Sequence, residues 1–107
     1  MEQCDGYFYL VLNAGCAEKD LKFLNEQKSG FDVSITQHDG ALVAIQGPAA
    51  HEVLKSVADP ATVDALYFMN TNDNVNVAGT NCRVTRCGYT GEDGFEVFSN
   101  YSFSSKP

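Results

Sequence analysis

Residues 85–97, TRCGYTGEDGFEV, form the most informative stretch of this chain. Glycine recurs there at every third position, at Gly88, Gly91 and Gly94, between two short runs of apolar character. Because glycine tolerates positive φ and permits close backbone approach, this spacing predicts a tight, shaped loop between two strands. The stretch also carries an aromatic ring at Tyr89 and a carboxylate just beyond the last glycine, at Glu96.

The glycine spacing by itself is typical of an ordinary hairpin, with the acids Glu92 and Asp93 expected to face solvent. No Lys-Ser or Lys-Thr follows the glycines, so the stretch is not a P-loop. The spacing Gly88-x-x-Gly91 is not the dinucleotide fingerprint, and the alternating Asp and Asn ligands of an EF-hand are absent. The glycine spacing alone therefore does not indicate a ligand, whereas the complete sequence of residues 85–97 does.

Composition limits the classes of partner. The 107 residues carry 14 acidic and 7 basic side chains, for a net charge of −7, and their number suits one small domain. This charge argues against non-specific binding to nucleic acid or to an anionic membrane. No apolar run approaches the roughly 18 residues of a membrane span. The first five residues show no basic targeting segment.

The four cysteines are expected to be free thiols in an intracellular protein. Cys82 and Cys87 lie five positions apart in one strand-like run and so point to opposite faces. No C-x-x-C occurs, and neither His38 nor His51 has ligand-like spacing to a cysteine, so no metal site is predicted. Both histidines are expected at the surface.

Hydrophobic periodicity and turn residues predict a β-α-β-β-α-β order followed by a hairpin and a last strand. The predicted strands are residues 7–12, 31–36, 41–45, 75–78, 81–85 and 95–98. The predicted helices are residues 17–28 and a segment from Gly47-Pro48 to Asp59-Pro60, with a further helical turn within residues 61–69. Residues 38–41 are predicted as a hairpin turn and residues 70–74 as a loop.

This order predicts a mixed α+β fold with a ferredoxin-like split βαβ core and an added β-hairpin. Residues 7–12 and 41–45 are apolar on both faces, which is typical of central strands, so they are predicted side by side in the middle of the sheet. The alternating run 31–36 is predicted at an edge. The face carrying Val43 and Ile45 is then expected to be buried against another copy of the chain or against residues 61–70.

Three blocks resemble the T-protein of the glycine cleavage system, a family of folate-dependent aminomethyltransferases. They are residues 9–21 (YLVLNAGCAEKDL), 44–50 (AIQGPAA) and 83–96 (RVTRCGYTGEDGFE). The resemblance implies that residues 1–98 are part of the folate-binding domain and that residues 99–107 are a frayed tail. It also implies an enzyme that transfers a methylene group from the aminomethyl-lipoyl arm of H-protein to tetrahydrofolate, with release of ammonia, in glycine catabolism.

The positions that match the family's folate contacts are Val11, Asn13, Tyr89 and Glu96. A carboxylate at Glu96 has two acceptor oxygens that suit the N–H and amino group on one edge of a pterin, and the Tyr89 ring suits its flat face. The family's catalytic aspartate lies in a Gly-Gly-x-x-Asp-Asp segment before the first block, and its arginine for the folate tail lies after the last. No catalytic residue is therefore assigned, and these 107 residues are expected to be inactive alone.

Two other functions stay open. The folate-binding parts of sarcosine and dimethylglycine dehydrogenases share this domain, but they are attached to a flavin domain, and no flavin motif occurs here. A non-catalytic domain that self-associates through an exposed apolar sheet face belongs to a different class. Folate affinity and solution mass separate these readings. The resemblance implies a mitochondrial location. Without the resemblance, the expected location is cytoplasmic.

Overall fold

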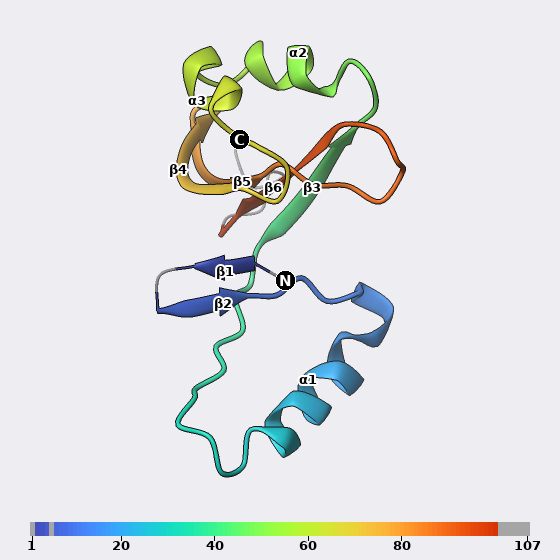
Figure 1. The fold of residues 1–107 in the computed structure, drawn as a ribbon, viewed down its shortest axis with the longest axis vertical. Helices are drawn as coiled ribbons and strands as arrows, with labels where there is room; N and C mark the ends of the chain where they lie inside the picture. Colours follow the sequence, from blue (N-terminus) through green and yellow to red (C-terminus); the bar gives the residue numbers. More distant parts are fainter. Residues whose placement is uncertain (1, 5, 101–107) are drawn as a thin grey trace, which may run out of the picture. The chain divides into compact units, whose positions relative to one another are not determined.

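The computed structural model describes residues 2–4 and 6–100. The chain divides into two compact units, residues 1–37 and residues 38–107 (Figure 1). The part of the tail at residues 101–107 lies outside the described residues, whereas Ser99 belongs to the last strand.

The first unit holds a short hairpin and a helix. Strand β1 (Glu2–Cys4) pairs antiparallel with β2 (Tyr7–Tyr9), and Gly6 between them has a φ of 78°. The 3-10 helix η1 (Ala14–Cys16) leads directly into α1 (Ala17–Gln27). Helix α1 confirms the helix predicted at residues 17–28, which the positive-φ Gly30 follows as a stop.

The second unit is a four-stranded antiparallel sheet in the order β3-β6-β5-β4. Its strands are β3 (Ala41–Gln46), β4 (Thr71–Val77), β5 (Thr80–Thr85) and β6 (Gly94–Ser99). Two short helices, α2 (Ala50–Lys55) and α3 (Pro60–Asp64), lie together over the sheet (Figure 1). Asp59 caps α3 by accepting the Thr62 N–H at 3.0 Å, with Pro60 at the start of the helix, where its missing N–H costs nothing.

The hydrophobic core of this unit lies between the helices and one face of the sheet. It consists of Ala50, Leu54, Val63, Leu66, Val75, Val77, Cys82, Val84, Phe95 and Val97. Burying each of the larger side chains contributes about 1.5–3 kcal/mol relative to leaving it exposed. Because neighbours along a strand point to opposite faces, Phe95 and Val97 face this core and Glu96 faces away from it.

The mixed α+β class is confirmed, but the predicted strand order is wrong. Strand β3 is an edge strand that pairs with β6 alone among the described residues, and β2 pairs with β1. Residues 31–36 form no strand. Sequence reasoning pairs neighbours along the chain, whereas β6 pairs with both β3 and β5 and occupies a central place. A side chain at Gly40 would collide with the Ser99 carbonyl, so Gly40 allows close approach to β6 instead of closing a hairpin.

The predicted burial of Val43 and Ile45 is half right. Ile45 packs against the core cluster, which includes Val63 and Leu66 from the predicted covering segment. Val43 is 44% exposed, because it lies on the edge strand. The predicted Asn-rich loop is also wrong in part, since β4 already begins at Thr71. The turn-forming character of these asparagines appears as a register shift between Asn72 and Val75 within the strand.

Among the described residues, no helix has both the length and the apolar character that crossing a membrane requires.

Candidate functional site

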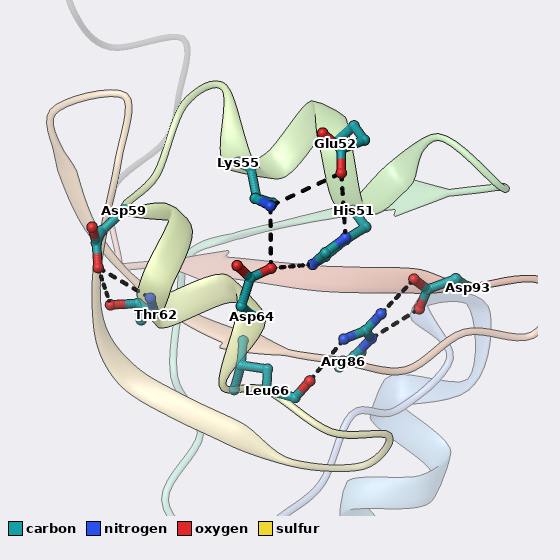
Figure 2. Close-up of polar contacts among 9 residues, drawn as sticks. All are labelled: His51, Glu52, Lys55, Asp59, Thr62, Asp64, Leu66, Arg86 and Asp93. Atoms are coloured by element: carbon teal, nitrogen blue, oxygen red, sulfur yellow. Dashed lines mark hydrogen bonds and ion pairs between the residues drawn. The ribbon is translucent and has the colours of Figure 1, made fainter.

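The glycine loop runs from the end of β5 to the start of β6 and is closed by an arginine fork. Arg86 Nε donates to Asp93 Oδ1 at 3.0 Å and Arg86 Nη2 donates to Asp93 Oδ2 at 2.7 Å (Figure 2). Arg86 Nη1 also donates to the Leu66 carbonyl at 2.8 Å, and the guanidinium carbon lies 5.2 Å from the centroid of the Phe95 ring. The expectation that Asp93 faces solvent is therefore wrong. The fork fixes both ends of the loop to the helical layer and to the core.

The same contacts shift two pKa values. The hydrogen bonds from Arg86 lower the pKa of Asp93 below its ordinary value of 3.8, against a smaller opposing effect of burial. The hydrogen bond to Asp93 raises the pKa of Arg86. Both groups therefore stay charged at neutral pH, and the fork is a charge-assisted pair.

Glu96 lies near the middle of β6, opposite Ala44 of β3 and Thr85 of β5. It is half-buried, and its side chain is on the sheet face opposite the core. Both of these neighbours have side chains smaller than that of Glu96. A central strand with a partner on each side holds the Glu96 backbone rigidly, which is the kind of support that a binding group requires.

Tyr89 belongs to the same unit and lies within the glycine loop. It is 81% exposed, so its ring offers a free face for stacking. The structure thus puts two of the predicted site residues on one loop and the strand that follows it.

The other two predicted residues, Val11 and Asn13, belong to the first unit, between β2 and η1. Val11 and Asn13 are exposed, and Leu12 between them is half-buried. The Asn13 carbonyl accepts the Cys16 N–H at 3.0 Å, and its side chain makes no cap hydrogen bond to the helix that follows. The amide of Asn13 is therefore not used in the turn that its backbone forms.

A second polar cluster, which sequence reasoning missed, joins α2 to α3. His51 Nε2 lies 2.8 Å from Asp64 Oδ1, and Lys55 Nζ lies 3.3 Å from the same oxygen (Figure 2). The His51 ring stacks on Phe95 with centroids 6.4 Å apart and planes at 16°. His51 is thus packed on the helical side of the sheet, opposite the face of Glu96. The i,i+4 spacing of His51 and Lys55 on a predicted helix could have indicated that their side chains lie close together. Nothing in the sequence indicated that Asp64 of α3 is their shared partner.

Other possible sites are less developed. A hollow of about 350 Å³ is lined by residues of α3 and the segment before and within β4, and none of the four predicted site residues lines it. Among residues 2–4 and 6–100, no three His, Cys, Asp or Glu side chains are grouped so as to hold a metal ion. Cys16, Cys82 and Cys87 form no disulfide bond, and burial raises the pKa of Cys82.

Comparison with known proteins decides the family. The model of the GCVT N-terminal domain matches residues 2–106. The chain belongs to the GCVT N-terminal domain family. This confirms the resemblance carried by the three sequence blocks.

Two mitochondrial relatives illustrate the similarity. The chain is 49% identical over 100 residues to the mitochondrial aminomethyltransferase of Canis lupus familiaris, covering 87% of this chain and 24% of that protein. It is 48% identical over 100 residues to the mitochondrial aminomethyltransferase of Homo sapiens, with the same shares of 87% and 24%.

A bacterial relative gives a similar result. The chain is 44% identical over 96 residues to the aminomethyltransferase of Thermoanaerobacter sp., covering 88% of this chain and 26% of that protein. The chain therefore spans about a quarter of the length of these curated relatives.

Proposed function

We propose that this chain supplies the pterin-binding part of an aminomethyltransferase that uses tetrahydrofolate as co-substrate. The observation that carries the proposal is the position of Glu96. Its carboxylate is presented from a central strand, on the face away from the core, directly after a loop that carries an exposed aromatic ring.

The residues present suit a pterin. The carboxylate of Glu96 accepts two hydrogen bonds from the N–H and the amino group on the pterin edge. Tyr89 packs against the flat face of the ring, which is the usual geometry of aromatic contacts. Val11 and Asn13, the other two proposed folate contacts, are both exposed in the first unit, where the amide of Asn13 is not used by its own turn.

The reaction moves a methylene group from the aminomethyl-lipoyl arm of H-protein to tetrahydrofolate and releases ammonia. H-protein is thus the proposed protein partner, and the mitochondrion the proposed compartment. The relatives described above are named aminomethyltransferases, which favours this class over the sarcosine and dimethylglycine dehydrogenases. We expect no turnover from these 107 residues by themselves, because no residue among them matches the family's catalytic aspartate.

A second candidate, self-association, is favoured by strand β3. The strand pairs with β6 on one side only among the described residues, and Leu42, Val43 and Ala44 are exposed on it. An uncharged edge strand with exposed apolar side chains is a template for pairing with another strand.

Backbone NMR during titration with tetrahydrofolate tests the folate proposal. We expect the amide shifts to change at Tyr89, at Glu96 and its neighbours on β6, and at Val11 and Asn13. Changes confined to α2 and α3, on the opposite side of the sheet, would contradict the proposed site. An absence of any change at saturating ligand would contradict folate binding itself.

A further inference from the structure

We propose that Gln46 is a positioning residue that holds the glycine loop in the shape that presents Tyr89 to the ligand. The identity of the ligand rests on the proposed function, whereas the contacts of Gln46 do not. Gln46 is the last residue of β3 and pairs with Gly94, the first residue of β6.

The side chain of Gln46 reaches across to the middle of the loop. Its Oε1 accepts a hydrogen bond from the Thr90 hydroxyl at 3.3 Å, between residues 44 positions apart in the chain. Thr90 Oγ1 in turn accepts the N–H of Glu92 at 3.4 Å. Next to Gln46, the Gly47 N–H donates to the Asp93 carbonyl at 2.9 Å. The end of β3 therefore contacts the loop at its centre and near its end.

Two of the three glycines make room for this side chain. A Cβ at Gly88 would lie 2.5 Å from Gln46 Oε1, and a Cβ at Gly94 would lie 2.6 Å from the same atom. The amide oxygen thus occupies the space that two side chains would fill. Gly91 has a different role, since it has a φ of +81° and no atom near the place of its Cβ. The glycine spacing, which alone is typical of a hairpin, is here explained by one side chain inserted between two loop positions.

The amide nitrogen of Gln46 indicates that this residue does more than fill space. Its Nε2 is buried and has no hydrogen-bond partner among the described residues. A buried donor without a partner opposes folding, and an unbranched apolar side chain such as Met would fill the same space without that cost. The acceptor oxygen is the part of Gln46 that the loop uses.

The consequence for the site follows from the order of residues. Tyr89 lies between Gly88, which packs on the Gln46 amide, and Thr90, which donates to it. Glu96 lies two positions beyond Gly94, the other glycine packed on that amide. Gln46 thereby fixes the exposed ring relative to the carboxylate, and a binding loop that is ordered before binding loses less entropy on contact with its ligand.

The test compares Gln46→Met, which keeps the shape and loses the acceptor, with Gln46→Glu, which keeps acceptor oxygens and loses the unpartnered donor. The readout is the backbone order parameter of the Tyr89 amide from NMR relaxation, with Val84 of the core as the internal reference. We expect Gln46→Met to lower the Tyr89 order parameter from the rigid range, about 0.85, toward about 0.6, with that of Val84 unchanged. Gln46→Glu is expected to keep the wild-type order parameter of Tyr89. An unchanged Tyr89 order parameter in Gln46→Met would overturn the proposal.

Thr90→Val removes the same hydrogen bond from an exposed position and therefore serves if a Gln46 variant does not fold. It is expected to mobilise Tyr89 to the same extent, and a rigid Tyr89 in Thr90→Val would equally overturn the proposal. Tetrahydrofolate affinity is measured in the same samples, and we expect a loss of about three- to tenfold in Gln46→Met and Thr90→Val. Wild-type chain that binds no tetrahydrofolate would remove the folate proposal, whereas the order parameters would still decide the role of Gln46.

Discussion

Arg86 and Asp93, at the two ends of the glycine loop, are joined by two side-by-side hydrogen bonds of 3.0 and 2.7 Å. The remaining nitrogen of the fork reaches the Leu66 carbonyl at 2.8 Å, and the guanidinium lies over the Phe95 ring. One side chain thus links the loop, the segment after α3 and the core. A lysine has neither the planar fork nor the stacking surface, although it keeps the charge.

Arg86→Lys is therefore expected to lower the free energy of unfolding by about 1–2 kcal/mol. The value is below that of a fully buried pair, because both side chains are partly exposed. Chemical denaturation of the wild type, Arg86→Lys, Asp93→Asn and the double variant measures it. Strict additivity of the two single effects would contradict a direct coupling between these residues.

Acid is expected to lower the free energy of unfolding, partly through protonation of Asp93. Its pKa lies below the ordinary 3.8 because Arg86 donates hydrogen bonds to the charged carboxylate. When the pH falls below 3.8, Asp93 becomes protonated in the unfolded chain while it is still ionised in the folded chain. The stabilisation is thus fully present above about pH 4 and is lost as the pH falls through the folded pKa. The difference in unfolding free energy between wild type and Asp93→Asn should shrink from pH 5 to pH 2, and a constant difference would contradict this. Glu92→Gln, on the same loop, is the control.

Gly88→Ala tests the close contact with Gln46. The new Cβ would lie 2.5 Å from Oε1, which is the end of a flexible side chain that can move away. We expect a loss of about 1 kcal/mol in the free energy of unfolding, of the order of one hydrogen bond, together with a mobile Tyr89. In a Gln46→Ala background the same substitution should cost much less, because the colliding atom is gone. An equal cost in both backgrounds would show that the strain comes from elsewhere.

The exposed edge of β3 is tested by solution mass. If copies pair through this strand, sedimentation should show an oligomer whose population falls in Val43→Lys, because a charge on the edge opposes strand pairing. Val53→Lys changes a valine of similar exposure on α2 and should leave the association unchanged. A wild-type chain that stays monomeric at all accessible concentrations would contradict self-association.

Local patterns predicted much of this fold. Helix α1 followed from apolar residues at helical spacing and the glycine stop, and the β4–β5 hairpin followed from alternation about Gly79-Thr80. The tight glycine loop was also predicted. In each case the determining contacts lie close together in the sequence, so that spacing carries the information.

The errors concern contacts between distant residues. Strand β3 pairs with β6 across sequence separations of 58 positions, for Ala41 with Ser99, down to 48, for Gln46 with Gly94, and no local pattern specifies that partner. The alternation of residues 31–36 predicts one apolar face but supplies no neighbouring strand. Gln46 and Thr90 likewise meet only through the β3–β6 pairing. The candidate site residues came from the family resemblance, and the structure added the rigid strand under Glu96.

Calorimetric titration with tetrahydrofolate, comparing wild type with Glu96→Ala and Glu92→Ala, tests the central claim most directly. Both glutamates belong to the glycine-loop region, but only Glu96 lies on the central strand beside Ala44 and Thr85. We predict weak binding by the wild type and by Glu92→Ala, and none that is measurable by Glu96→Ala, because the pterin edge then loses its charged acceptor. Equal affinity of all three proteins would remove Glu96 from the site and contradict the proposed mode of folate recognition.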